Sequence, residues 1–390
     1  MKVLYIDPWY ANNSNLYYYS SGLADSIGQR CDLTVVCSKK CDIPDKAHYQ
    51  TKKYFFGLSD KMKKNKIRKI VRGIEYVLAY KKILNLLGKE HYDIVHIEWL
   101  LFYKFDLKML KKIKNKTRLL IFKAHNVIPH VNGEGYVPIL NKIYAIPDII
   151  LLHGFNLINE FKNMFPIYSA KTRIQKFGIN LNHNLDFDTN SISESIASKV
   201  KSFGRVFIFF GRIGYGKGVD RIINAWKENS QFDTSLLIIA GKTTSDVNEK
   251  ELCDSVNGMN NIMLLNGYVE DNLLNYLIFN SNIVLMPYRE GSMSAVAFTA
   301  AEFSKPILST NFGSITEYVI DNECGFISEN DDIAFVSKLK TIDLSYTNDE
   351  LSAVGQKYNK YLNDNYGWDE IGEELVNDVY KQELISKGND

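Results

Sequence analysis

Short apolar runs alternate with longer stretches of helical period along this sequence, and this alternation constrains the fold more than any other feature. Five runs of strand length lie in the first half of the chain, at residues 3–6, 33–36, 94–97, 119–122 and 149–152. Strands that are apolar throughout are typical of parallel sheets covered on both faces by crossover helices. The first half therefore predicts an α/β domain with a parallel sheet.

The same alternation restarts after a polar stretch at residues 180–195. The second series of apolar runs lies at residues 206–210, 236–240, 262–265, 283–286 and 306–309. A chain of 390 residues also exceeds what one hydrophobic core usually supports. We therefore predict two Rossmann-like domains, residues 1–185 and 186–365. A final segment, 366–390, contains an amphipathic helix from Trp368 to Ile385.

Charge is distributed unevenly between the two halves. Residues 1–180 contain 30 Lys and Arg against 14 Asp and Glu, whereas residues 181–390 contain 17 against 31. Such asymmetry indicates that the first half meets an anionic partner, and a nucleic acid, an anionic membrane or a phosphorylated substrate would each fit. No nucleic-acid recognition module is apparent, so we do not expect a nucleic-acid partner.

The basic charge is concentrated in residues 52–89, which contain twelve Lys and Arg and two acids, Asp60 and Glu75. Apolar residues recur there at helical spacing, namely Ile67, Ile70, Val71, Ile74, Val77, Leu78 and Leu84. This spacing predicts a helix packed on the sheet with a basic outer face. We expect that face to attract anionic lipid headgroups, and the aromatic side chains of residues 54–56 to dip into the membrane interface.

Two further features bear on the membrane. No run approaches the ~18 apolar residues that a spanning helix requires, and no signal peptide is apparent. We therefore expect a cytoplasmic protein that is peripheral at the inner face of the cell membrane.

The loop after the predicted strand 206–210 combines glycines with two cations. Residues 211–218 read Gly-Arg-Ile-Gly-Tyr-Gly-Lys-Gly, and a helix is predicted to follow. Glycines let the backbone approach a ligand closely, Arg212 and Lys217 supply positive charge, and a helix N-terminus favours anions. The segment nearly matches a P-loop, but Gly218 replaces the hydroxyl residue that binds Mg²⁺. The loop predicts a diphosphate site and weakens an NTPase interpretation.

A second loop, residues 287–296, follows the predicted strand 283–286 and precedes a helix predicted at 297–303. Its small residues leave backbone amides exposed at the helix start, and Glu290 is placed to accept hydrogen bonds from sugar hydroxyls. An alternative is equally compatible with this loop alone. Glu290 would then only complement the helix dipole, and Ser292 or Ser294 would cap the helix.

Taken together, the loops resemble the retaining glycosyltransferases of family 4, which have the GT-B fold. The resemblance rests on the order and spacing of five segments, at residues 211–220, 237–241, 267–269, 288–291 and 305–307. It is firm over residues 205–330 and looser, but co-linear, over 1–200. It implies two Rossmann-like domains whose parallel sheets face an interdomain cleft. It also implies transfer of a sugar with retention, and a final helix that crosses back to the first domain.

The resemblance also implies roles for residues of the second domain. Arg212 and Lys217 would hold the donor diphosphate, and Glu290 would contact the donor sugar. Further donor contacts would come from Gly211, Gly241, Tyr268, Val269, Gly291, Ser292, Met293 and Ser294. The family often has a second glutamate that contacts the ribose, and Thr299 stands in its place here, one residue farther from Glu290 than usual. Thr299 retains one hydrogen-bond donor for that purpose.

In the first domain, His125 follows the predicted strand 119–122 and matches a histidine of the family. The resemblance implies that His125, with Asn126 beside it, lies at the reacting end of the cleft. The family's paired glycines after the first strand correspond to Ser14 and Asn15, whose side chains would bind phosphate or the acceptor. His96 lies inside a predicted strand and is expected to pack in the core or near the cleft.

The resulting hypothesis is a glycosyltransferase that uses a nucleoside-diphosphate sugar, with a UDP-sugar preferred to a GDP-sugar. We expect neither metal nor cofactor, because the two cations take the place of a divalent ion. The expected acceptor is a glycan or lipid-linked glycan of bacterial surface-polysaccharide synthesis. Two alternatives are a nucleotide-sugar epimerase of similar fold and a non-catalytic nucleotide-sugar-binding subunit.

Overall fold

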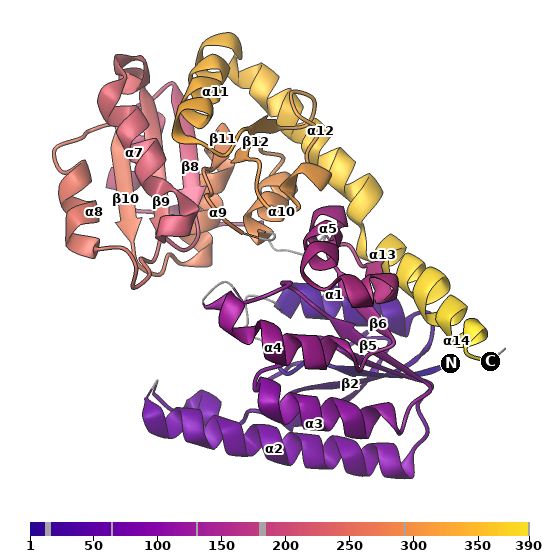
Figure 1. Cartoon of the computed structure of the whole chain (residues 1–390). Helices are drawn as coiled ribbons and strands as arrows, with labels where there is room; N and C mark the ends of the chain where they lie inside the picture. The colour runs from indigo at the N-terminus through magenta and orange to yellow at the C-terminus, as the bar shows by residue number, and fades with distance from the viewer. Residues whose placement is uncertain (12–16, 64, 130–131, 179–184, 292–293, 389–390) are drawn as a thin grey trace. The chain divides into compact units, whose positions relative to one another are not determined.

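The chain folds into two compact units, each built on one parallel sheet (Figure 1). The computed structural model describes residues 1–11, 17–63, 65–129, 132–178, 185–291 and 294–388. Unit 1 comprises Met1–Asn180 together with Tyr366–Asp390, and unit 2 comprises Leu181–Asn365. The expectation of two Rossmann-like halves with parallel sheets is confirmed.

Within the described residues, the sheet of unit 1 has seven strands in the order β3-β2-β1-β4-β5-β6-β7. Their bounds are β1 (Lys2–Ile6), β2 (Asp32–Ser38), β3 (Gln50–Phe55), β4 (Ile94–Ile97), β5 (Leu119–Lys123), β6 (Ile149–Leu152) and β7 (Thr172–Ile174). The five apolar runs predicted as strands are all strands. The predictions omitted β3 and β7, which are the edge strands. β3 is largely polar and β7 has only three residues, so neither forms an apolar run.

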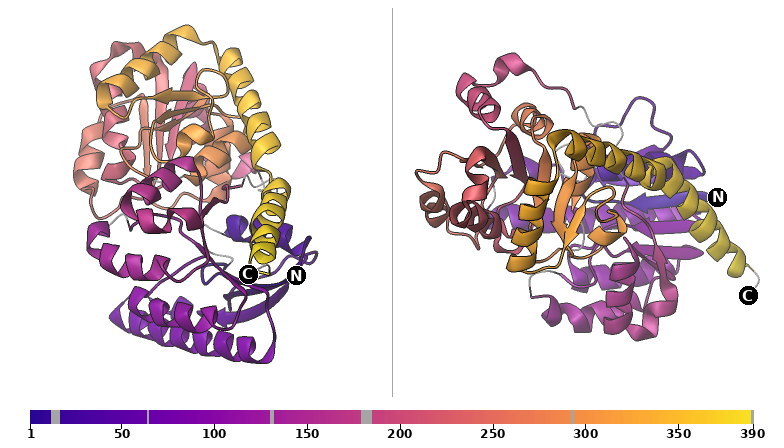
Figure 2. Two further views of the ribbon diagram at one scale, coloured as in Figure 1. Left: turned by 45° about the vertical axis from the view of Figure 1, so that its right-hand side comes forward. Right: turned by 90° about the horizontal axis from the view of Figure 1, so that it is seen from above.

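Helices cover both faces of this sheet. One face packs against α2 (Lys66–Lys89), α3 (Tyr103–Lys114), α4 (Gly133–Tyr144) and α5 (Phe155–Met164). The other face packs against α1 (Tyr17–Gly28) and the end of the chain, which comprises α13 (Trp368–Glu374), a π-helical stretch (Leu375–Lys381) and α14 (Gln382–Ser386). Figure 2 shows these final helices beside the sheet of unit 1. Side chains such as Ile371 and Val376 complete the core there.

Helix α2 differs from the expectation in the face that it buries. Its buried residues are Tyr76, Ala79, Tyr80, Ile83, Leu86 and Leu87. Five of the apolar residues predicted to pack are exposed instead, namely Ile67, Ile70, Ile74, Val77 and Leu78. The helix is apolar on both sides, so its periodicity did not show which side faces the sheet. No helix in the described part of the chain is both long and apolar enough to cross a membrane.

The aromatic residues that precede α2 correct a second expectation. Phe55 and Phe56 are buried and pack against Tyr76 of α2, so they do not dip into a membrane interface. Tyr54 is partly buried beside the same core. Their position at the end of β3, a strand that the sequence did not predict, explains why they belong to the core.

Unit 2 has a six-stranded sheet over its described residues, in the order β10-β9-β8-β11-β12-β13. The strands are β8 (Arg205–Phe210), β9 (Ser235–Gly241), β10 (Ile262–Asn266), β11 (Ile283–Met286), β12 (Ile307–Thr310) and β13 (Phe326–Ser328). The helices are α6 (Glu194–Lys201), α7 (Val219–Glu228), α8 (Glu249–Val256), α9 (Asp271–Phe279), α10 (Ala295–Glu302), α11 (Asp332–Ser345) and α12 (Asn348–Tyr366). All five predicted strands are present, and β13 is the short edge strand that was not predicted.

Candidate active site

The glycine-rich loop and the Glu290 loop of unit 2 follow neighbouring strands. The loop at 211–218 follows β8 and the loop at 287–294 follows β11, and these two strands pair at the point where the strand order reverses. Such a switch point, at the carboxyl ends of parallel strands, is where open α/β sheets bind ligands. The two loops predicted to share one site therefore lie at the same edge of one sheet.

Two glycines are required by the backbone at this edge. Gly218 has a φ of 65°, and a Cβ atom there would lie 1.9 Å from the carbonyl oxygen of Pro287. Gly241 has a φ of 158°, and a Cβ atom there would lie 1.7 Å from the carbonyl oxygen of Gly211. Only glycine accommodates both the left-handed conformation and such close backbone approach. The two loops and the end of β9 are thus packed together through their backbones.

Arg289 links the two loops through hydrogen bonds and an ion pair. Its backbone N–H donates to the carbonyl oxygen of Gly216 at 2.8 Å, and its guanidinium donates to both carboxylate oxygens of Asp220 at 2.7 and 2.6 Å. The same guanidinium donates to the carbonyl oxygen of Tyr215 at 3.1 Å. A bidentate pair of this kind fixes geometry as well as charge. Sequence reasoning did not assign Arg289 a role, although its segment carried part of the resemblance.

Lys217, Arg212 and Glu290 come together at this framework. The ammonium nitrogen of Lys217 lies 3.7 Å from the centre of the buried Tyr288 ring. Burial and the nearby charge of Arg212 together lower the pKa of Lys217 to about 8, although the charge of Glu290 opposes them. Glu290 packs on Gly216, where a Cβ atom would lie 2.7 Å from its Cγ. Two cations, one of them exposed, therefore lie near one carboxylate, and they outnumber it.

The start of α10 adds backbone amides to the same loop. Ser294 is the N-cap residue, but its side chain makes no capping hydrogen bond and lies 3.3 Å from the hydroxyl of Tyr288 instead. Gly291 precedes it, and a Cβ atom built there would lie 4.0 Å from the ammonium nitrogen of Lys217. Thr299 is half-buried on the same helix. Ser292 and Met293 lie outside the described residues.

The remaining predicted donor contacts follow β10. Gly267 donates its N–H to the carbonyl oxygen of Gly241 at 2.9 Å, which joins this loop to the end of β9. Tyr268 is 76% exposed and Val269 is half-buried. Tyr268 thus presents an uncovered ring at the carboxyl edge of the sheet.

The carboxyl edge of the unit 1 sheet has a different character, because it gathers buried polar residues. One such residue lies at or directly after the carboxyl end of each of five adjacent strands, β1 and β4 to β7. In that order they are Asp7, Glu98, Lys123, His153 and Gln175, and all five side chains are buried. His125 was noted because it follows a predicted strand, and position after a strand would have pointed to these residues too. Ser14 and Asn15 lie outside the described residues.

His125 binds protein groups through both ring nitrogens. Its Nε2 lies 2.8 Å from a carboxylate oxygen of Glu98, and its Nδ1 lies 3.0 Å from Nε2 of His153. The ring stacks on Trp99 at 3.6 Å between centroids. A carboxylate only accepts hydrogen bonds, so Nε2 carries the proton. Burial lowers the pKa of His125, although the hydrogen bond to Glu98 opposes this effect.

Glu98 is the centre of this buried network. It is fully buried, accepts a hydrogen bond from the Tyr19 hydroxyl at 3.3 Å, and lies 3.3 Å from Nε2 of His96. His96 in turn is bonded to the hydroxyl of Tyr380 at 2.6 Å, so the prediction that His96 packs in the core is confirmed. The pKa of Glu98 is lowered well below its ordinary value by His125 and His96, despite burial.

Two further buried charges border this network. Burial, followed by the charge of Glu98, raises the pKa of Asp7 to about 7. Burial lowers the pKa of Lys123 to about 7, and its ammonium donates to the carbonyl oxygen of Gln175 at 2.8 Å. Ionisable groups whose pKa values are shifted to about 7, and which lie at the end of a strand, are typical of functional sites.

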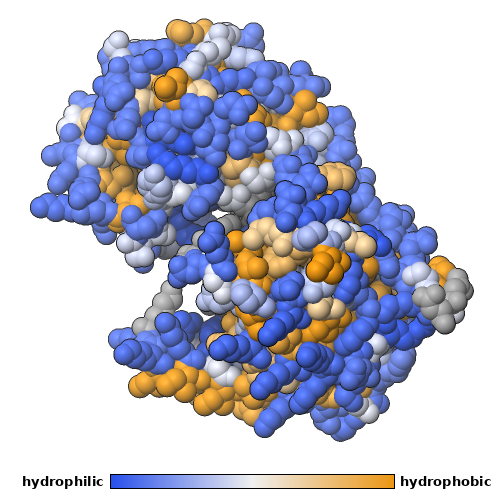
Figure 3. Space-filling view, viewed as in Figure 1, coloured by the Kyte–Doolittle hydropathy of each residue, from blue (hydrophilic) through white to orange (hydrophobic). Residues whose placement is uncertain are grey.

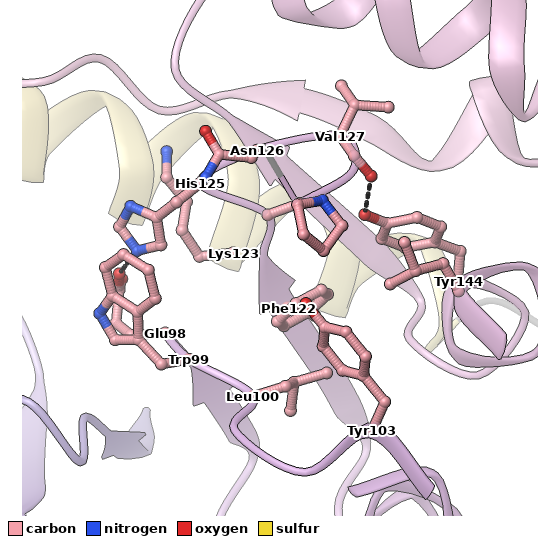
Figure 4. Close-up of a pocket in the computed structure, with 13 residues that line it drawn as sticks. Glu98, Trp99, Leu100, Tyr103, Phe122, Lys123, His125, Asn126, Val127 and Tyr144 are labelled. Carbon is pink, nitrogen blue, oxygen red and sulfur yellow. Dashed lines mark hydrogen bonds and ion pairs between the residues drawn. The ribbon is translucent and has the colours of Figure 1, made fainter. Parts of the chain in front are cut away.

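Beside the network lies a cavity of about 370 Å³ within unit 1 (Figure 4). Its wall is mostly apolar and aromatic, and includes Trp99, Leu100, Tyr103, Phe122, Leu140 and Tyr144. In Figure 4, His125 and Trp99 stack at one side and Tyr103 and Tyr144 lie at the other. His125 and Asn126 both border the cavity, as a role at the acceptor side would require.

Comparison with known proteins finds a family resemblance in the second unit. Residues 192–360 match the family described as Glycosyl transferases group 1. Over 318 residues, the chain is 23% identical to an uncharacterized glycosyltransferase of Methanocaldococcus jannaschii, with 77% of this chain and 78% of that protein covered. These matches support a glycosyltransferase.

A second relative and a solved structure extend the comparison. The chain is 23% identical over 218 residues to the capsular polysaccharide biosynthesis glycosyltransferase CapM of Staphylococcus aureus, covering 53% of this chain and 55% of CapM. Its fold is similar to that of Anabaena HepE, solved in complex with UDP and glucose, at a TM-score of 0.67 and 13% identity. That similarity covers 98% of this chain and 100% of HepE. The chain thus has the GT-B fold.

Proposed function

We propose that the chain transfers a sugar from a nucleoside-diphosphate donor to a hydroxyl acceptor, with retention at the anomeric carbon. The observation that carries this proposal is the surplus positive charge of Arg212 and Lys217 at the switch point of unit 2. Burying a lysine next to an arginine is unfavourable unless an anion joins them, and a donor diphosphate is such an anion. The donor would be a UDP-sugar in preference to a GDP-sugar, in agreement with the UDP bound to HepE.

The chemical task is to stabilise negative charge on the departing diphosphate. Arg212, Lys217 and the first amides of α10 form a set of donors whose places are fixed before the reaction, and such preorganised donors lower the barrier most. Glu290 lies beside them and would bind hydroxyls of the donor sugar. Because the two cations supply the charge that a metal would otherwise supply, the reaction would require no divalent ion or other cofactor.

The acceptor would be a lipid-linked glycan of cell-surface polysaccharide synthesis, bound by unit 1. CapM, a relative at 23% identity, acts in capsular polysaccharide biosynthesis. Residues 1–180 carry a net charge of +16, which suits an acceptor presented on an anionic surface. The cavity bordered by His125 and Asn126 would receive part of this acceptor. The protein would act in the cytoplasm, peripheral at the inner face of the cell membrane.

The structure bears on three rival functions. A P-loop NTPase needs a hydroxyl residue where Gly218 stands, and a Cβ atom at that position would lie 1.9 Å from a backbone carbonyl oxygen. A nucleotide-sugar epimerase would convert the donor without an acceptor. A non-catalytic binding subunit would bind nucleotide and release no product. The last two are separated from a transferase by product analysis with and without acceptor.

The decisive experiment measures donor binding and turnover in matched variants. UDP, GDP, ADP and their sugars are screened by thermal shift, since a ligand that binds the folded state raises the melting temperature. We expect UDP or a UDP-sugar to give the largest shift. Lys217→Ala and Arg212→Ala should each abolish most of that shift and lower turnover about 10²–10³-fold, the effect of losing one preorganised donor.

Lys227→Ala is the matched control, because Lys227 is exposed in the last turn of α7, the helix that begins beside Gly218. It should leave binding and turnover unchanged. Wild-type binding and turnover in both Lys217→Ala and Arg212→Ala would contradict the proposal.

A further inference from the structure

Helix α2 exposes an apolar stripe along its outer face. Ile67, Ile70, Ile74 and Leu78 follow one another at spacings of three or four residues, so they lie on one side of the helix. Their exposed fractions are 62%, 64%, 55% and 49%. Figure 3 shows hydrophobic residues in a row at the lower edge of the molecule, over α2. Apolar side chains exposed in such a row indicate an interaction surface.

Several cations of α2 have no acidic partner among the described residues, although Arg68 and Arg72 pair with Asp60. Five lysines of α2, namely Lys66, Lys69, Lys81, Lys82 and Lys89, form no ion pair with any described residue. The one acid of the helix, Glu75, accepts hydrogen bonds from the backbone amides of Gly57, Leu58 and Ser59 at 2.8, 2.8 and 3.0 Å. These amides lower the pKa of Glu75 to about 2. Its carboxylate therefore stays ionised but is bonded to backbone amides rather than paired with one of these lysines.

A hollow of about 290 Å³ adjoins the stripe between β3 and α2. Its lining comprises three lysines and one acid, with apolar and polar neighbours, namely Lys39, Lys81, Lys82, Glu75, Tyr54, Leu78, Ala79 and Asn85. The ammonium of Lys82 lies 5.5 Å from the centre of the Tyr54 ring. Leu78 belongs both to the hollow and to the stripe, so the basic pocket and the apolar surface are continuous. A phosphate group held by the three lysines would stand directly beside apolar side chains.

We propose that this surface docks on an anionic lipid bilayer, with α2 lying in the interface plane. The stripe would insert among the acyl chains, and the lysine-lined hollow would receive a phosphate-bearing headgroup. An amphipathic helix with lysines beside an apolar face binds a membrane in this way, and each cation near an anionic surface adds to the affinity. The surface differs from the one expected from sequence, because Phe55 and Phe56 are buried and the stripe of α2 takes their place.

The test is vesicle co-sedimentation of the full chain without donor. Wild type should bind vesicles that contain about one third phosphatidylglycerol, bind phosphatidylcholine vesicles weakly, and dissociate at high salt. The stripe variant Ile70→Gln/Ile74→Gln should lower the partition coefficient on the order of tenfold. The hollow variant Lys81→Gln/Lys82→Gln should lower it on the order of tenfold on the anionic vesicles alone.

Each variant has a matched control. Ile333→Gln/Leu344→Gln removes two apolar side chains that are 84% and 75% exposed on α11 of unit 2. Lys111→Gln/Lys112→Gln removes two exposed lysines of α3. Both controls should bind as wild type does, and thermal melts should show that all four variants fold.

Two outcomes would overturn the proposal. In the first, wild type ignores the anionic lipid, or the controls lose as much binding as the stripe and hollow variants. In the second, sedimentation velocity shows a dimer that the stripe variant dissociates while vesicles are not bound, so a second copy covers the stripe. The inference shares with the proposed function only the idea of a membrane-borne acceptor. Vesicle binding without donor and the UDP thermal shift therefore fail independently.

Discussion

The carboxyl edges of the two sheets place charge in opposite ways. In unit 1, Glu98 is fully buried and is bound by His125 and Tyr19, so its charge is balanced inside the protein. In unit 2, Arg212 is exposed and Lys217 only partly covered, and one carboxylate faces the two cations. At the same edge of the same sheet type, the buried carboxylate is therefore bound by protein groups in unit 1, whereas unit 2 has one carboxylate for two cations. The edge with an excess of positive charge is therefore the one suited to bind an anionic ligand.

The same contrast distinguishes a lysine whose pKa is lowered where it supports the fold from a lysine whose pKa is lowered where a ligand would bind. Both Lys123 and Lys217 have pKa values lowered by burial, to about 7 and about 8 respectively. Lys123 donates to a backbone carbonyl of its own unit, so it is held in the fold. Lys217 faces a tyrosine ring and another cation, an arrangement that an incoming diphosphate would relieve. We use three predictions to test this difference, from the largest effect to the smallest.

The largest effect concerns the backbone frame of the unit 2 edge. Gly218→Ala should destabilise unit 2 by about 2–4 kcal/mol, because the new Cβ atom would meet the carbonyl oxygen of Pro287 and the residue has a left-handed φ. Urea unfolding measures the change. Gly204→Ala is the control, since a Cβ atom there meets nothing within 4 Å. Equal stability of both variants would show that the frame is not rigid.

The second effect tests internal balance at the unit 1 edge. Glu98→Gln should lower the free energy of unfolding at pH 7 by about 1–3 kcal/mol, since the bonds from His125 and Tyr19 lose a charged acceptor. The pKa of Glu98 is lowered in the fold, so the wild-type advantage is present above pH ~4.3 and is lost as the pH falls through the folded value. Chemical denaturation at pH 7 and pH 4 would measure it.

A matched control is Glu90→Gln, which removes an exposed carboxylate paired with Lys2 and should not change stability measurably. If Glu98→Gln unfolds no more easily than Glu90→Gln, the buried network contributes nothing and the contrast between the edges is wrong.

The smallest effect is the pH dependence of donor binding. Lys217 has a pKa of about 8 before binding, and a diphosphate favours the protonated form. Below pH 8 the lysine is already charged, so affinity for UDP should be constant. Above pH 8 binding must take up a proton, and the apparent Kd should rise by up to about tenfold per pH unit. Isothermal titration between pH 7 and pH 9.5 would measure this slope.

Lys217→Arg supplies the comparison for the pH series, because arginine stays charged throughout this range. Its UDP affinity should lose the slope above pH 8. A slope that persists unchanged in Lys217→Arg would assign the titration to another group.

Patterns local in sequence predicted the greater part of the fold. Ten apolar runs became ten strands, because these segments carry an uninterrupted apolar signal. The edge strands β3, β7 and β13 escaped prediction, since each is short or partly polar, whereas the edge strand β10 forms an apolar run and was predicted. The loops at Lys217 and Glu290 were also assigned to one site, because the order and spacing of their motifs resemble those of a known family.

Contacts between distant segments could not be predicted from these patterns. Glu98 and His153 stand after different strands, and nothing in the local sequence pairs them with His125. Arg289 and Asp220 lie 69 residues apart. Their bidentate contact exists only because β8 and β11 are neighbours in the sheet. Roles of this kind depend on which strand ends meet.

The order of residues by itself determined two α/β halves, a glycine-rich cationic loop and a basic first half, because hydrophobic period, glycine content and charge are properties of adjacent residues. The tertiary structure decided which side of α2 faces water, which cations stay unpaired and which histidine nitrogens are occupied. Each of these depends on what a side chain meets from elsewhere in the chain. For α2, whose two sides are both apolar, only packing against the sheet could make that choice.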